Sequence, residues 1–183
     1  MARSYLTPTA LPANPASTLH VATKQYADAL DPVNLVGADD VFAYYYSNAA
    51  QTVANNTDAW ISFGGSQDTN ALITQTTASP GHKFTLGTTG IWAVTVSARW
   101  VSGGGTGERY LGLWSDVSGS EDVIQAWGGV GASGSPTTMT VSLVGKFTSG
   151  NYVTGRVYQA SGGNLDLENG WSHILISLVR KLT

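Results

Sequence analysis

The stretch IWAVTVSARW at residues 91–100 decides the fold class, because a large or small apolar side chain occupies every second position. Successive side chains of a β-strand point to opposite faces, so this spacing gathers the apolar set on one face. That set is Trp92, Val94, Val96, Ala98 and Trp100. TTMTVSLVGKF at residues 137–147 alternates in the same way. Each stretch is therefore predicted to be a strand with one buried face.

The same two-residue alternation, broken by glycine, runs from residue 39 to the end of the chain. Turn signals such as GGGTG at 103–107 and TSGN at 148–151 separate the apolar runs. Regularly spaced short strands of this kind, about eight to ten of them, are typical of an antiparallel sandwich or barrel. The expected strands are 41–46, 59–63, 82–86, 91–100, 108–114, 122–130, 137–147, 152–159, 165–167 and 171–182.

The composition agrees with an all-β protein. The chain has 183 residues, of which only 11% are charged, against roughly 25% in an average soluble protein. It contains 22 glycines, 6 tryptophans and 8 tyrosines, and no cysteine. These numbers exclude a coiled coil, a long helical bundle and an acidic disordered chain. Without disulfides, stability has to come from core burial, with oligomerisation as a further source.

Charge and hydropathy exclude two classes of partner. The nine basic residues are scattered, with Arg180-Lys181 the only adjacent pair, whereas a nucleic-acid surface needs clustered cations. No apolar run approaches the roughly 18 residues that a membrane span requires. MARSY at residues 1–5 has one charge and no apolar core, so we expect no secretory signal there. The expected partners therefore include neither nucleic acid nor a membrane.

The last expected strand, 171–182, is apolar on both faces, which is unusual for a sheet with one solvated side. One face carries Ile174, Ile176 and Leu178, and the other carries Leu175 and Val179. Such a strand lies in the middle of a sheet that is covered on both sides. In a two-layer sandwich, a neighbouring subunit often supplies the second cover.

Composition changes near residue 37, and this change sets the expected domain boundary. Prolines at positions 8, 12 and 15 forbid a helix and disfavour an internal strand in residues 1–20, so an extended arm is expected there. One short helix is expected over residues 19–30, with Ala22, Tyr26 and Leu30 on one face, and Asp31-Pro32 ends it. This helix would dock on its own domain or on copies of itself or a larger assembly. We therefore expect an attachment arm at 1–36 and a β head at 37–183.

Catalytic and metal-binding patterns are missing from the sequence. The three histidines, His20, His82 and His173, have no companion at metal-ligand spacing. The acidic residues lie in loops, where solvated carboxylates are a simpler interpretation than calcium ligands or a glycosidase pair. No serine stands in a nucleophile elbow, and the glycine runs lack the lysine and helix of a phosphate loop. We expect no catalytic residue, no metal and no cofactor.

The aromatic residues admit two interpretations. Most of them are expected in the core or between subunits, including Tyr44, Tyr46 and Tyr158. Trp114 and Trp127 flank loops and would form a platform for sugar rings in an alternative interpretation. Asp116 and Asp122 would then bond sugar hydroxyls as part of a glycan contact.

The order of features in residues 39–182 resembles the trimeric jelly roll of the complement globular heads and the tumour-necrosis-factor ligands. The matching segments are Lys83-Phe84-Thr85, Gly90-Ile91-Trp92, Gly150-Asn151-Tyr152-Val153 and Trp171-Ser172-His173-Ile174. Asn151 stands where the family has an acid, and His173 stands where it has a glycine. The resemblance implies a homotrimer with one sheet of each subunit around the three-fold axis. The interface it suggests contains Tyr44, Tyr46, Tyr152, Tyr158 and His173.

A second resemblance lies in the N-terminal segment. Asn14-Pro15, followed by Leu19-His20-Val21-Ala22-Thr23-Lys24-Gln25-Tyr26-Ala27-Asp28, is similar to a segment of tailed-bacteriophage fibre and virion surface proteins. Ala27 replaces the valine of that pattern. The resemblance implies an arm that anchors the protein to the particle. The anchoring residues it suggests are Pro15, His20, Ala22, Tyr26 and Leu30.

Together these features predict a non-enzymatic structural protein on the virion surface, made in the host bacterial cytoplasm. Only DPVNLVGA at 31–38 separates helix and head, so no long shaft is present between them. This favours a capsid decoration or head spike docked on the major capsid protein. The alternative is a tail fibre or tail-tip adhesin, docked on tail proteins, that binds host surface glycans. A further alternative is a cellular carbohydrate-binding module.

Overall fold

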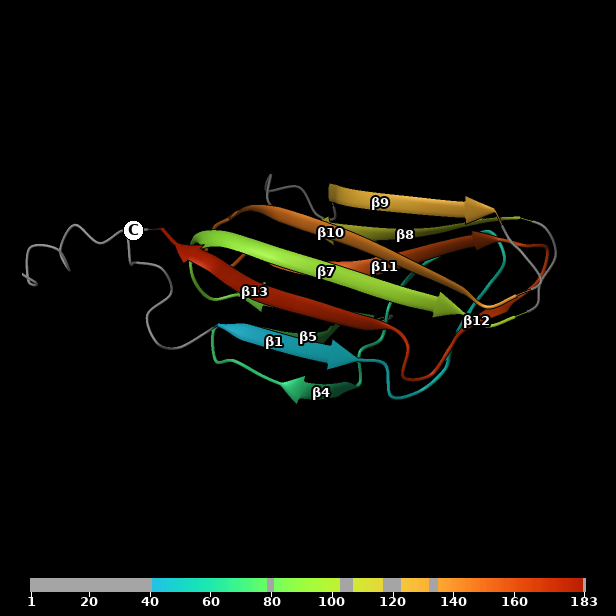
Figure 1. The fold of residues 1–183 in the computed structure, drawn as a ribbon, viewed down its shortest axis with the longest axis horizontal. Helices are drawn as coiled ribbons and strands as arrows, with labels where there is room; N and C mark the ends of the chain where they lie inside the picture. The colour runs from blue at the N-terminus through green and yellow to red at the C-terminus, as the bar shows by residue number, and fades with distance from the viewer. Residues whose placement is uncertain (1–40, 79–80, 103–106, 117–122, 132–134, 183) are drawn as a thin grey trace, which may run out of the picture.

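The computed structural model describes residues 41–182 apart from 79–80, 103–106, 117–122 and 132–134. Two antiparallel sheets lie face to face across these residues, with β1, β13, β7 and β10 in the layer nearest the viewer of Figure 1. The expected arm and helix at 1–36 lie outside the described residues. Within the described part of the chain, no helix is long and apolar enough to cross a membrane.

The thirteen strands of the described residues divide between the two sheets in jelly-roll order. Sheet A has the order β2-β12-β7-β13-β1-β4, and β10 pairs with the free side of β7. Its strands are β1 (Phe42–Tyr46), β2 (Gln51–Val53), β4 (Gly65–Asp68), β7 (Gly90–Trp100), β10 (Thr137–Phe147), β12 (Leu165–Leu167) and β13 (His173–Lys181). Sheet B has the order β5-β6-β11-β8-β9, with β3 also paired to β11. Its strands are β3 (Thr57–Trp60), β5 (Ile73–Ala78), β6 (Gly81–Leu86), β8 (Glu108–Ser115), β9 (Val123–Gly131) and β11 (Tyr152–Ala160).

The all-β, jelly-roll prediction is confirmed, and the structure adds three strands that the sequence did not predict: β2, β4 and β5. These strands are short or polar, so they lack the apolar alternation on which the prediction relied. The expected strand at 59–63 also shifts, because β3 is Thr57–Trp60. Ile61 and Phe63 lie beyond its end and are fully buried.

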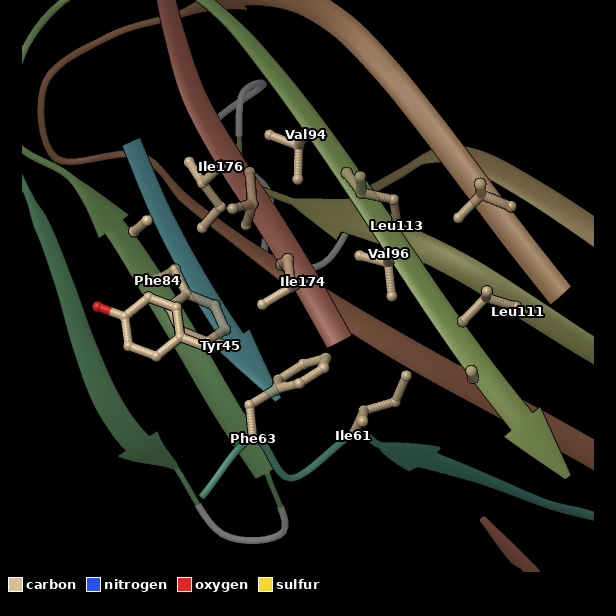
Figure 2. Packing of buried hydrophobic residues seen from close by; sticks show 14 of the residues in the cluster. Tyr45, Ile61, Phe63, Phe84, Val94, Val96, Leu111, Leu113, Ile174 and Ile176 are labelled. Carbon is tan, nitrogen blue, oxygen red and sulfur yellow. The ribbon is translucent and has the colours of Figure 1, made fainter. Parts of the chain in front are cut away.

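The core lies between the two sheets and contains the alternating side chains that the sequence singled out. Trp92, Trp100 and Ile174 are fully buried. Figure 2 shows side chains of β7 and β13, such as Val96, packed against residues of sheet B such as Leu111. Side chains from the inner faces of both sheets therefore form one shared core.

Two glycines occupy positions where a side chain would be unfavourable. Gly155 lies in the middle of β11, where an added Cβ would come within 2.8 Å of Val96 Cγ1 on the opposite sheet. Gly150 has a φ of 94° in the turn before β11, a value that favours glycine. In the same turn the Thr148 amide donates a hydrogen bond of 2.7 Å to Asn151 Oδ1. The predicted turn at 148–151 is confirmed.

Candidate functional site

The outer faces of the two sheets differ in chemistry. On sheet A, paired strands align outward side chains in rows that run from β1 across β13 and β7 to β10. One row is Tyr46, His173, Ser97 and Thr140; the next is Tyr44, Leu175, Thr95 and Ser142; the third is Phe42, Ser177, Ala93 and Val144. We call these twelve residues the neutral face.

The neutral face combines aromatic, hydroxyl and aliphatic side chains without an aspartate, glutamate, lysine or arginine. Charged residues occur only around it, such as Arg99, Lys146 and Asp68. In the single chain, 65% of Val144 is exposed, while Leu175 is half-buried. The face therefore presents apolar groups that the protein's own core does not cover.

The aromatic end of the neutral face is held together by ring contacts. The Tyr44 ring centroid lies 6.4 Å from that of Tyr46 and 5.5 Å from that of His173. Towards β10, the Thr95 and Ser142 hydroxyl oxygens are 2.9 Å apart and hydrogen-bonded. Burial lowers the pKa of His173 from its ordinary value. A neutral imidazole suits a face without charged groups.

Sheet B carries a hollow on its outer face, which we call the aromatic groove. Its volume is about 410 Å³, and its lining comes from β3, β8 and β11. The lining residues are Asp58, Tyr110, Leu111, Gly112, Trp114, Arg156 and Tyr158. The alternation of β8 places Tyr110, Gly112 and Trp114 on one face, so the residue between the two rings has no side chain. This spacing leaves the floor of the groove open.

Two cations lie against aromatic rings of sheet B, and of these Arg156 lines the groove. Arg156 Cζ is 4.4 Å from the centre of the Trp114 ring and 4.9 Å from that of Trp60. Lys83 Nζ is 4.5 Å from the centre of the Trp60 ring and 4.0 Å from that of Tyr152. The negative face of an aromatic ring attracts such cations, and partial burial strengthens the attraction. The two cations and the two tryptophans form one connected cluster.

Tyrosines form the other wall of the aromatic groove. The ring centroids of Tyr110 and Tyr158 lie 5.8 Å apart with their planes tilted by 37°, and the two residues are paired across β8 and β11. The Tyr110 hydroxyl donates a hydrogen bond of 2.7 Å to Glu108 Oε2. This bond, together with burial, raises the pKa of Tyr110. The hydroxyl therefore stays protonated at neutral pH.

The structure splits the five residues suggested as an interface. Tyr44, Tyr46 and His173 lie together on the neutral face. Tyr152 and Tyr158 belong to β11 of the opposite sheet, where they contribute to the aromatic groove and its cation cluster. One flat surface cannot contain all five side chains.

The suggested glycan contacts are also separated. Trp114 lines the aromatic groove. Asp116 Oδ1 accepts a hydrogen bond of 2.8 Å from the Tyr152 amide, so this carboxylate holds the start of β11. Trp127 pairs through its backbone with Gly112, and its side chain lies outside the described residues. Asp122 and the suggested anchoring residues also lie outside them: Pro15, His20, Ala22, Tyr26 and Leu30.

Among the described residues, no group of three histidine, aspartate or glutamate side chains could hold a metal ion. His82 Nδ1 accepts a hydrogen bond of 2.9 Å from the Phe63 amide, which gives this imidazole a structural role. Burial lowers the pKa of His82, and the imidazole stays neutral when it accepts this bond.

Sequence reasoning missed Trp60, Lys83 and Arg156 as site residues. The two-residue spacing of Tyr110, Gly112 and Trp114 indicated a shared face, but the neighbours across the sheet depend on strand register. Arg156 pairs with Trp60 on one side and with Gly112 on the other. No local pattern in a single sequence specifies those pairings.

Comparison with known proteins supports the architecture. No protein-family model and no curated protein matches the chain. Among solved structures, the chain is similar to Eiger TNF from S. frugiperda, with a TM-score of 0.59 and 12% sequence identity. The match covers 79% of this chain and 95% of that one. At this identity the likeness concerns the fold, so the chain has a TNF-like jelly-roll fold.

Proposed function

We propose that the protein is a homotrimeric, non-enzymatic surface protein of a tailed-phage particle, anchored through residues 1–36 with the β head projecting outward. The neutral face is the observation that carries the trimer. An extended outer face with exposed Val144 and without charged groups is unusual on a monomer. Depletion of charge with enrichment of tyrosine is instead the composition of an interface core.

Sedimentation of the purified chain at micromolar concentration tests the trimer. The expected mass is about three times 19.1 kDa. If folding and assembly are coupled, dilution should also lower the thermal midpoint. A stable monomer of 19.1 kDa would refute the proposed assembly without affecting the fold.

The proposed place on the particle rests on the segment Asn14–Asp28 and its resemblance to virion surface proteins. Deletion of residues 1–36 should leave a soluble trimer that no longer joins particles. Tyr26→Ala should weaken attachment, because it removes the largest apolar group from one helix face. The expected loss is about 1–3 kcal/mol per copy, multiplied by avidity if three arms bind together.

Antibody labelling of intact particles separates the two proposed locations. We favour a capsid decoration or head spike, because only residues 31–38 connect the expected helix to the head. Label over the capsid would support this location, and label at the tail tip would support the adhesin. If deletion of residues 1–36 leaves the amount on particles unchanged, the arm is no anchor, and absence of the full-length protein from particles would favour a cellular carbohydrate-binding module.

The aromatic groove favours a second candidate function, a tail adhesin that binds host glycans. A pyranose ring presents a face of C–H groups that fits the negative face of an aromatic ring. Trp114→Ala should therefore reduce adsorption of particles to host cells while trimers still assemble. Trp171→Ala is the matched control, because Trp171 is 52% exposed and stacks with Arg99 away from the groove.

A further inference from the structure

We propose that the aromatic groove binds acidic saccharides, with Arg156 recognising the carboxylate of a sugar whose ring rests on Trp114. This inference rests on the adhesin candidate above and specifies its ligand class. It depends on the placement of Arg156 in the groove, independently of the trimer.

The dimensions of the groove fit a small saccharide better than a flat protein partner. A volume of about 410 Å³ lies within the range of small-molecule sites. Tyr110 and Tyr158 form one wall, Trp114 lies two positions beyond Gly112, and the missing side chain at Gly112 leaves the space between them open. Rigid aromatic side chains lose little conformational entropy when a ligand binds.

The partly buried guanidinium of Arg156 favours an anionic ligand. Arg156, the cation of the lining, lies against the Trp114 ring face, in a position that partial burial shields from water. Only 18% of the Arg156 side chain is exposed. Electrostatic attraction between opposite charges grows as the local dielectric falls. Arginine is also suited to carboxylates, because its planar fork matches two carboxylate oxygens.

One acidic side chain among the described lining residues competes with such a ligand. Asp58 Oδ2 lies 3.8 Å from an Arg156 terminal nitrogen, longer than the 2.7–2.9 Å that is usual for a charge-assisted hydrogen bond. Asp58 is 49% exposed, so a ligand carboxylate could displace it. Loss of this carboxylate should therefore tighten the binding of an acid.

A saccharide array provides the first test. The full-length chain is applied to an array that carries uronic-acid, sialic-acid and neutral glycans of matched length. Binding confined to acid-bearing glycans is expected. Binding to neutral glycans alone would overturn the acidic-ligand inference but leave the adhesin standing, and binding to none would overturn both.

Titration calorimetry on the best acidic glycan then tests the assigned residues. Its methyl ester should bind at least tenfold more weakly, because the ester removes the negative charge, adds one methyl group and leaves the sugar ring unchanged. Arg156→Gln should weaken binding of the acid at least tenfold, whereas Arg99→Gln should leave it unchanged. Arg99 is a matched control because it also stacks on a tryptophan, Trp171, and pairs with a carboxylate, Glu168.

Asp58→Asn keeps the test valid if Arg156→Gln fails to fold. This exposed substitution should tighten the acid severalfold and leave the methyl ester unchanged. Equal affinity for acid and ester in the Asp58 variant would refute the role of charge. Binding of a tetraglutamate peptide as tight as that of the glycan would refute the saccharide and indicate an acidic peptide instead.

Discussion

The two outer faces of the sandwich are built from the same kind of strand, yet they differ in what they can bind. The neutral face of sheet A pairs aromatic with hydroxyl side chains, and its charges lie around the rim. The outer face of sheet B places Arg156 and Lys83 among tryptophans and tyrosines. Both faces follow from alternation over one shared core. This difference is the basis for proposing a copy of the chain as the partner of the first face and an anionic ligand for the second.

The largest effect should come from a charge placed in the middle of the neutral face. Leu175→Asp should convert the proposed trimer to a monomer, because an unpaired carboxylate buried at an interface costs several kcal/mol. Sedimentation should show the change at micromolar concentration. Thr74→Asp on β5 of sheet B is the matched control, since Thr74 is exposed, and it should remain trimeric. A Leu175→Asp trimer would place the subunit interface elsewhere.

A smaller effect should distinguish the tyrosines of the two faces. Tyr44→Ala removes a ring that contacts Tyr46 and His173 and should weaken the proposed trimer by about 1–3 kcal/mol per subunit. Tyr158→Ala removes a ring that contacts Tyr110 and should leave the trimer intact. Dissociation constants from dilution series provide the measurement. If Tyr158→Ala dissociates the trimer instead, sheet B contributes to the interface.

The sequence predicted features of the fold that depend on neighbouring residues, and it did not predict features that depend on which distant strands pair. Alternation in 91–100 and 137–147 identified β7, β10 and their buried faces, because alternation is a local property of the chain. The separation of Tyr44 from Tyr158 was not predictable, since it depends on which strands pair. β1 pairs with β13 in sheet A, whereas β11 pairs with β8 in sheet B.

Of the cluster formed by Trp60, Lys83, Trp114 and Arg156, the sequence pointed to Trp114 alone as a binding residue. Trp114 was a candidate only in the alternative glycan interpretation, whereas Arg156 was overlooked because a lone basic residue in a strand has no local signature. Asp116 was a ligand contact only in the alternative glycan interpretation, and a carboxylate directly after a strand can equally accept a backbone hydrogen bond. It accepts one from the Tyr152 amide. Short polar strands such as β4 were missed for a related reason, because they contribute no apolar side chain to the core.

Changing the ionic strength should distinguish trimer formation through the neutral face from glycan binding in the aromatic groove, without any substitution. The neutral face carries no charged side chain, so the proposed trimer should keep nearly the same dissociation constant between about 50 and 500 mM NaCl. Binding of an acidic glycan to the aromatic groove should weaken severalfold over that range, because salt screens partly exposed charges. Calorimetry and sedimentation in the same buffers measure both. A trimer that dissociates at high salt would point to the rim charges as its main contacts.

The smallest effect should be a pH dependence of assembly that comes from His173. Burial lowers the pKa of His173 below its ordinary value of 6.5, so the unfolded chain binds a proton that the folded chain does not. As pH falls through 6.5, the free energy of unfolding should therefore decrease. On the neutral face His173 lies beside Tyr44 and pairs with Tyr46 and Ser97. Its protonation would place a charge there, and acid should also dissociate the proposed trimer.

His82 provides the comparison, because burial lowers its pKa too, but it lies in β6 of the other sheet. Protonation of His82 would remove the acceptor of the Phe63 amide and loosen the head itself. His173→Gln should thus make assembly independent of pH between about 7.5 and 5.5, while acid still lowers the thermal midpoint. His82→Asn should reduce the acid effect on the midpoint and leave assembly sensitive to acid. If His173→Gln trimers dissociate in acid as the original chain does, another titrating group controls the interface.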